Sequence, residues 1–460
     1  MVTVLVPAGS LGTGVREEEV AYGIAAGAHV IASDAGSTDS GAAYLALGIS
    51  KNTREAVKND LVILMKAQAE AGIPLIVGSC GQAGGNSGLQ WTADIVVEIA
   101  RELALTPRVA LLHSEQDAAV LKRKNAQGKI HPLPPLGSLD DATIDACDHI
   151  VAAMGPEPYI AALADGADII LGGRTTDTAV LAAYPLYRGI APAPVWHAAK
   201  VAECGAQCTV NPSVGRGVMM RIENEGFDIE PADVNIACST HSVSAHMLYE
   251  NSDPFRLIEP GGILDVTGAN YQQLDARTVR VTGSRWEPMP YTMKLEGAAG
   301  GPYQTIMMVG IEDPAVLSQL DLFHHHMLAA LNARVERTIG HEAGDYDISL
   351  RIYGWNAVSG QAVPRDAPPP REVGVLCVTT AATQSLATRI AKTCNPLFFH
   401  LPISANIELP SYGFAFSPAE IERGRVYEFK LNHVVETTDA FELISTSWID
   451  LRSRLAASTV

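Results

Sequence analysis

The chain has 460 residues, of which 47% are hydrophobic and 18% charged, and its formal net charge is −18. This balance is typical of a globular protein with more than one domain and excludes a disordered chain. Nucleic acid is not an expected partner, because its binding needs a basic face and the sequence contains no run of lysine and arginine.

The first residues, 1–7, show no basic segment followed by an apolar stretch, and no segment reaches membrane-spanning length. We therefore expect neither a signal peptide nor a membrane partner. The seven cysteines are an odd number at irregular spacing, which favours reduced thiols over a disulfide framework. A cytoplasmic protein is the resulting expectation.

Short apolar runs alternate with helical patterns along the first half of the chain. In chain order, the predicted elements are strand 2–6, helix 16–26, strand 29–33, helix 52–71, strand 74–78, helix 92–103, strand 108–113, and strand 168–171 followed by a helix. Continuous apolar strands in this alternation predict an α/β fold with a mostly parallel sheet and helices on both faces. Between an open sheet and a barrel, we favour the open sheet.

The second half has a different pattern, in which strands and helices are segregated. Strands are predicted at 218–229, 278–283, 293–295, 305–310, 346–353, 373–379 and 427–435, helices at 314–339 and 383–393, and an exposed proline-rich loop at 361–371. We therefore predict an α/β core domain over 1–285 and a smaller α+β C-terminal domain over 286–460.

Four predicted strands end in turns rich in Gly, Ser, Thr and Asp, at 9–14, 34–41, 79–88 and 172–177. Ligands of α/β sheets bind at such strand ends, where helix N-termini offer free N–H groups and glycine lets a ligand approach. The turns predict a pocket for a small anionic substrate, with ordinary capping as the alternative; no turn matches a nucleotide-binding loop. The substrate-binding candidates are Ser10, Gly12, Ser37, Thr38, Gly84, Gly85, Asn86, Arg174 and Thr175.

Arg174 and a few titratable residues could carry the chemistry. A guanidinium just past a buried strand can hold a carboxylate, but an ion pair with Asp177 that only fixes the turn fits equally well. The acid/base candidates are Asp34, His113, Asp177 and His241. Helix capping is the alternative for Asp34 and is favoured for Asp39, while a structural role is the alternative for His241.

Two cysteine positions suggest other chemistry. Cys80 lies between a strand and glycines, where a helix N-terminus would make it nucleophilic, although a buried filler is the commoner role. Cys204 and Cys208 are followed by no second Cys/His pair at zinc spacing, which argues against zinc. No ligand spacing supports a divalent metal on the carboxylates either, so the need for a metal stays open.

Several blocks of the chain resemble the acyclic terpene utilisation AtuA-like family, formerly a domain of unknown function. These blocks are 8–14, 83–86, 155–158, 164–177, 201–208, 274–283, 417–421 and 426–434. The block 164–177, which ends in Gly-Gly-Arg-Thr-Thr-Asp, is the most specific of them. After the second strand, residues 34–39 stand where many members carry a Glu-Arg type segment, so we expect a divergent subgroup with a different substrate.

The resemblance implies a catabolic setting with branched or carboxylated acids and acyl-CoA thioesters, and a small companion protein. We therefore expect a lyase or hydratase that acts on a small carboxylate or its acyl-CoA ester, by proton abstraction and oxyanion stabilisation. CoA would enter as part of the substrate. The alternatives are a non-catalytic anion-binding subunit of a hetero-oligomeric enzyme and a hydrolase that uses Cys80. We expect a homo-oligomer, or a hetero-oligomer with the companion protein.

Overall fold

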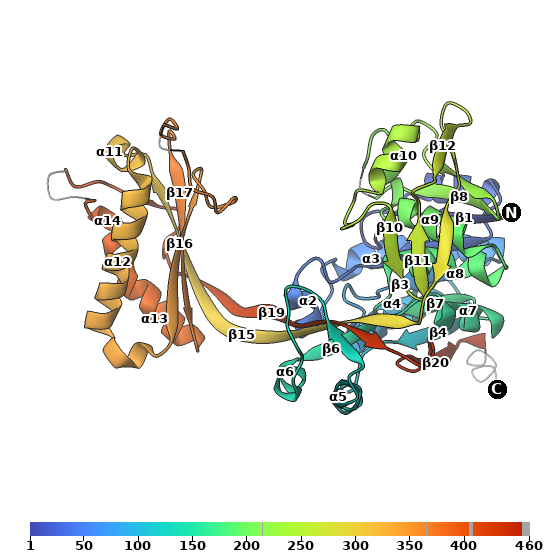
Figure 1. Cartoon of the computed structure of the whole chain (residues 1–460), viewed down its shortest axis with the longest axis horizontal. Coiled ribbons are helices and arrows are strands. Elements are labelled where there is room, and N and C mark those ends of the chain that lie inside the picture. The colour runs from blue at the N-terminus through green and yellow to red at the C-terminus, as the bar shows by residue number, and fades with distance from the viewer. Residues whose placement is uncertain (214, 365, 404–407, 453–460) are drawn as a thin grey trace. The chain divides into compact units, whose positions relative to one another are not determined.

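The computed structural model describes residues 1–213, 215–364, 366–403 and 408–452 (Figure 1). It divides into two compact units, unit 1 with residues 1–299 and 428–460 and unit 2 with residues 300–427. The strands β15 (Thr292–Ile311) and β19 (Ile421–Glu436) each contribute residues to both units. From the sequence, the division was predicted at residue 285, with the whole C-terminal end in the second domain.

Unit 1 is built on an open sheet of ten strands. From edge to edge these are β12 (Asn270–Gln273), β13 (Val279–Thr282), β9 (Gly226–Pro231), β8 (Val218–Glu223), β1 (Val2–Val6), β2 (Val30–Asp34), β3 (Leu75–Gly78), β7 (Ile169–Gly172), β4 (Arg108–His113) and β20 (Ser445–Asp450). The five strands β1, β2, β3, β7 and β4 are mutually parallel, and every other pairing is antiparallel. The prediction of a mostly parallel sheet is therefore wrong, because the sheet is mixed.

The antiparallel strands join the sheet through partners that are distant in sequence. One strand was predicted over 218–229, but the chain turns at residues 224–225 and forms the hairpin of β8 and β9. β8 then pairs with β1 along its whole length, and β20 pairs with β4 at the opposite edge. An apolar pattern locates a strand but does not specify its partner, which is why the mixed sheet was missed.

Helices cover both faces of the parallel strands. One face packs against α1 (Glu17–Ala25), α3 (Arg54–Ala71) and α4 (Asn86–Glu102), and the other against α7 (Glu157–Ala164), α8 (Asp177–Tyr187) and α9 (Pro192–Ala202). Successive strand residues alternate between these faces, so that Val4 belongs to the core of the second face and Leu5 to that of the first. Burial on both sides explains why the strands are continuously apolar.

The order of the parallel strands creates a crevice. β7 lies between β3 and β4, although β4 precedes it in the chain. The helix α4 connects β3 to β4 over one face, and α8 leaves β7 over the other. Ligands of α/β sheets bind where the strand order changes in this way, at the carboxyl ends of the strands.

Smaller elements complete unit 1. They are α2 (Ala42–Leu47), α5 (Ala118–Ala126), α6 (Asp141–Ala146), α10 (Thr240–His246), the 3-10 helix η1 (Gly205–Cys208), the three-stranded sheet of β10 (Arg256–Glu259), β11 (Gly262–Asp265) and β14 (Arg285–Pro288), and the strands β5 (Ile130–Pro132) and β6 (His149–Ala153). β6 pairs with the first part of β15, from Lys294 to Ala298. This pairing fixes the position of the start of β15, which carries Lys294 and Glu296, against β6.

Unit 2 combines strands with helices. Besides its parts of β15 and β19, it contains α11 (Pro314–Leu317), α12 (Leu320–Thr338), η2 (Gly340–Ala343), β16 (Tyr346–Tyr353), β17 (Val373–Ala381), α13 (Gln384–Cys394), α14 (Leu397–His400) and β18 (Gly413–Phe414). The helix predicted over 314–339 is two helices, and the strands predicted at 293–295 and 305–310 are one strand. Residue 365 of the predicted proline-rich loop lies outside the described residues.

Among the helices of the described residues, none combines the length and the apolar character needed to cross a membrane.

Candidate functional site

The turns after β1, β2, β3 and β7 meet at one edge of the main sheet. A cavity of about 360 Å³ is lined by residues from all four turns, among them Gly9, Asp34, Gln82 and Asp177. A second cavity, of about 370 Å³, shares Asp177 and Glu203 with the first. The two cavities therefore form adjacent parts of one candidate site, which lies within unit 1.

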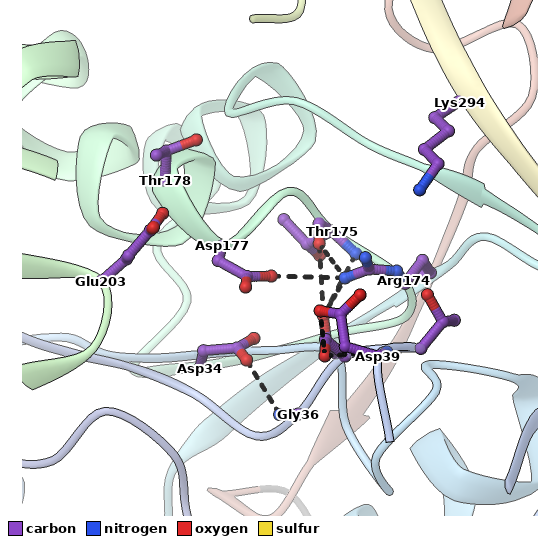
Figure 2. Close-up of polar contacts among 12 residues, drawn as sticks. Asp34, Gly36, Asp39, Arg174, Thr175, Asp177, Thr178, Glu203 and Lys294 are labelled. Atoms are coloured by element: carbon purple, nitrogen blue, oxygen red, sulfur yellow. Dashed lines mark hydrogen bonds and ion pairs between the residues drawn. The ribbon is translucent and has the colours of Figure 1, made fainter. Parts of the chain in front are cut away.

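Arg174 is buried, and most of its guanidinium is bonded within the protein. Nε donates to Oε2 of Glu296 at 2.8 Å, and Nη1 donates to the carbonyl of Thr175 at 2.7 Å. Nη1 also lies 3.3 Å from Oδ1 of Asp177 and 3.3 Å from the hydroxyl of Ser79 (Figure 2). These hydrogen bonds come from Nε and Nη1, and Arg174 lines the second cavity. The side chain thus fixes the turn and also borders the second cavity.

Glu296, on β15, is the principal partner of Arg174. Its Oε1 accepts a hydrogen bond from the hydroxyl of Thr38 at 2.7 Å and from Nζ of Lys294 at 2.8 Å. Burial alone would raise the pKa of Glu296, but Arg174 and Lys294 beside the carboxylate hold this pKa at about 2. Lys294 also lines the second cavity, so two cations, Arg174 and Lys294, border it (Figure 2).

Asp34 and Asp177 are two carboxyl groups with raised pKa values in the first cavity. Asp34 ends β2, and its Oδ2 accepts the Gly36 N–H at 2.9 Å. Its Oδ1 is buried and has no hydrogen-bond partner among the described residues. Burial and the nearby charge of Asp177 raise the pKa of Asp34 well above its ordinary value. Burial also raises the pKa of Asp177, against the opposing charge of Arg174.

Several backbone N–H groups of the glycine-rich turns are bonded to carboxylates of the protein itself. Asp60, on α3, accepts hydrogen bonds from the N–H groups of Gly12 at 2.7 Å and Val15 at 2.8 Å. The N–H of Asn86, at the start of α4, donates to Oε2 of Glu115 at 2.6 Å. These groups were expected to hold the substrate. Because these N–H groups are already bonded within the protein, they are not available to a substrate.

Three of the predicted binding residues instead support Arg174 or its surroundings. The carbonyl of Gly84 accepts the backbone N–H of Arg174 at 3.0 Å. Gly84 has a φ of +67°, and a Cβ there would collide with the backbone of Arg174. Gly85 is buried beside it, and Thr175 is buried with its hydroxyl 2.7 Å from that of Tyr159.

The polar side chains of the first two turns border the first cavity. Ser10, Ser37 and Asp39 line it, and the hydroxyl of Ser37 donates to Asp39 at 2.7 Å. The prediction that Asp39 caps a helix is wrong, because α2 begins after Gly41 and has no side-chain cap. Asp39 instead pairs with Ser37 at the rim of the cavity.

The two predicted histidines lie outside both cavities. The ring of His113 is bonded on both sides, to Oδ1 of Asn86 at 2.9 Å and to the hydroxyl of Ser447 at 2.8 Å. Burial lowers the pKa of His113, so the ring favours its neutral form. His241 is exposed on α10 and lines neither cavity. We therefore assign both residues structural or surface roles.

Cys80 is buried in the core beneath the site. Its Sγ lies 3.8 Å from the carbonyl of Val77, and α4 begins only at Asn86. Burial raises the pKa of Cys80, which keeps the thiol protonated. These observations argue against a nucleophilic Cys80 and favour the filler role.

Sequence reasoning missed several residues of the site. Glu259, on β10, accepts a hydrogen bond from Thr178 at 2.8 Å, and burial raises its pKa to about 7. Glu203 and Cys204 follow α9, and His246 ends α10; their potential ligand atoms lie within 4.8 Å of one another. These residues come from separate segments with no shared motif spacing. A charged residue in an apolar strand, as at Glu296, was the signal available in the sequence.

Comparison with known proteins identifies the family. A family model described as acyclic terpene utilisation family protein AtuA matches residues 54–415. No curated protein and no solved structure gives a significant match. The matched range covers most of the chain and includes the turn that carries Arg174, whereas residues 34–39 lie outside it. The chain therefore belongs to the acyclic terpene utilisation family AtuA, as its motifs indicated.

Proposed function

We propose that the chain is an acid–base enzyme, a lyase or hydratase, that acts on a small carboxylate or its acyl-CoA ester. The observation that carries this proposal is the pair Asp34 and Asp177, two carboxyl groups with raised pKa values that line one cavity. Buried carboxyl groups whose pKa values are displaced into the working range are characteristic of proton-transfer sites. The family name, acyclic terpene utilisation, supports a role in catabolism.

The substrate carboxylate or thioester carbonyl is proposed to bind in the second cavity. The side chains of Arg174 and Lys294 are the donors there, and Leu257 and Ile258 provide apolar wall for an acyl chain. A cavity of about 370 Å³ accommodates a small acyl group, but not a CoA moiety in addition. In a thioester substrate, the CoA part would therefore extend outside the cavity.

The two aspartates are proposed to divide the proton transfers. Asp177, which Arg174 holds toward its ionised form, removes the proton α to the carboxyl or thioester group. The cations Arg174 and Lys294 stabilise the negative charge that develops on the oxygen. Asp34, whose raised pKa favours its protonated form, donates a proton to the leaving hydroxyl group, which departs as water.

Solvent hydrogen exchange tests this proposal on a panel of candidate substrates. Short branched and hydroxylated carboxylic acids, and their CoA thioesters, are incubated with the full chain in D₂O and followed by nuclear magnetic resonance. We expect deuterium at the α position of at least one compound. Asp177→Asn should reduce the exchange rate by about 100-fold or more, since general-base catalysis contributes about 10²–10⁴.

Asp39→Asn is the matched control, since Asp39 borders the same cavity but is an exposed side chain bonded to Ser37. It should leave exchange within a few-fold of the wild-type rate. Binding of a carboxylate without exchange of any compound would contradict the proposal and favour the non-catalytic anion-binding subunit. Exchange that survives Asp177→Asn at full rate would contradict the assigned base.

A further inference from the structure

We propose that Glu203, Cys204 and His246 form a binding site for a divalent transition-metal ion of the zinc class. The three residues come from two segments, the end of α9 and the end of α10. Their ligand atoms, one from each side chain, all lie within 4.8 Å of one another. The acid–base steps proposed above use none of these three residues, so the metal site does not depend on the proposed function.

The imidazole of His246 provides the second, independent observation. The residue is only 7% exposed, and its Nε2 is buried with no hydrogen-bond partner among the described residues. Leaving such a nitrogen unsatisfied is unfavourable, so a partner is expected. The ring of Tyr249 stacks on the imidazole, with 5.5 Å between centroids and 20° between planes. This stacking restricts the orientation of the His246 imidazole, which lies close to Cys204 and Glu203.

The donor set selects the class of ion. A thiolate and an imidazole are ligands for zinc and related transition metals, whereas calcium and magnesium take oxygen ligands. Tetrahedral ligand atoms at zinc distances lie about 3.5 Å apart, so a pair of ligand atoms at the 4.8 Å limit would need to close by roughly 1 Å. Bound metal would also keep the Cys204 thiol in its thiolate form.

The site has an open side. Glu203 and Cys204 line the first cavity, and Glu203 also lines the second. Three protein ligands with a fourth position facing a cavity are typical of catalytic rather than structural zinc. Asp177 and Glu250 line the same cavity and add negative charge that favours a cation.

Lys200 is the competing cation at this place. Its Nζ forms an ion pair with Oε1 of Glu203, and the lysine is 6% exposed. Because a carboxylate has two oxygens, Glu203 can keep this ion pair and still offer Oε2 to a metal. In that arrangement Lys200 orients the metal-binding carboxylate.

Cobalt titration of the full chain tests the proposal directly. The purified protein is stripped with a chelator and titrated with Co²⁺, whose thiolate charge-transfer absorption reports a cysteine ligand, and then with Zn²⁺. We expect one equivalent to bind, with the absorption abolished by Cys204→Ser and unchanged by Cys208→Ser. His246→Gln should weaken binding by more than about 100-fold, since even outer-shell partners contribute about 10–100-fold. His241→Gln, on the same helix, should not.

Alkylation of the wild-type chain gives a second measurement that needs no variant to fold. Cys204 and Cys147 are both partly exposed, and only Cys204 belongs to the proposed site. Zn²⁺ should slow iodoacetamide labelling of Cys204 at least tenfold, as mapped by mass spectrometry, and leave Cys147 unchanged. Absence of the cobalt absorption, or equal labelling of Cys204 with and without Zn²⁺, would overturn the proposal.

Discussion

Glu296→Gln removes the charge at the centre of the Arg174 cluster while keeping the shape of the side chain. In the wild type, the buried carboxylate accepts hydrogen bonds from Nε of Arg174, Nζ of Lys294 and the hydroxyl of Thr38. A glutamine amide can satisfy only part of this set, since its NH₂ group faces cations. Arg174 is then left as a buried charge that only the more weakly placed Asp177 balances.

The cost follows from the pKa of Glu296. The two cations lower this pKa from an ordinary value of 4.5 to about 2 despite burial, which corresponds to about 3 kcal/mol of stability at neutral pH. The range measured for breaking buried ion pairs, about 3–5 kcal/mol, agrees with this value. Because the folded-state pKa is lowered, the contribution is complete above 4.5 and is lost as the pH falls toward 2. The penalty of Glu296→Gln should therefore shrink to roughly 2 kcal/mol at pH 3.5.

Urea unfolding of the wild type and of Glu296→Gln, at pH 7 and at pH 3.5, measures the loss of unfolding free energy at each pH. Tryptophan fluorescence suits unit 1, because four of the five tryptophans lie within its residues. Glu98→Gln is the control, since Glu98 also pairs with two cations, Arg54 and Lys58, but is 38% exposed. Solvent screens that cluster, so its loss should be much smaller. A Glu296→Gln penalty below about 1 kcal/mol at pH 7, or one that does not decrease at pH 3.5, would refute the reasoning.

Three further predictions concern the frame of the site. Gly84→Ala should destabilise unit 1 by at least about 2 kcal/mol in urea unfolding, because φ is +67° and the Cβ meets the backbone of Arg174. Asp60→Asn should cost about 1–3 kcal/mol and speed amide hydrogen exchange in residues 12–15, since their N–H groups lose a charged acceptor. Burial lowers the pKa of His197 to about 3, so its imidazole should stay neutral at pH 5 by nuclear magnetic resonance. Its stabilising contribution is complete above 6.5 and should decline by about 2 kcal/mol by pH 5.

The parts of the fold that depend on local sequence were predictable. Strands that are apolar on both faces, such as 2–6 and 108–113, and long amphipathic helices, such as 54–71, were located within a few residues. In each case a continuous run or a 3.6-residue period determines the element without reference to distant partners. Local sequence patterns also predicted the four glycine-rich turns at strand ends. In the structure, residues from all four turns line one cavity.

What sequence could not supply were contacts between distant segments. β8 beside β1 and β20 beside β4 turn a parallel sheet into a mixed one, and neither pairing has a local signature. The glycine-rich turns carried a second ambiguity, because a loop that fits an external anion also fits an internal carboxylate. Asp60 occupies one such loop from a helix about 45 residues later, and only the tertiary structure distinguishes these cases.

The charge balance of the site connects substrate binding with proton transfer. Arg174 and Lys294 face the ionised carboxylate of Glu296, so one positive charge remains to be balanced. An ionised Asp177 supplies that balance, whereas ionisation of Asp34 as well would give the group a surplus negative charge that repels an anionic substrate. In the proposed reaction, a protonated Asp34 is therefore required twice, once to admit the anion and once to donate the proton. The bound anion in turn raises the pKa of Asp34 further, so that binding favours the protonation state on which the proposed reaction depends.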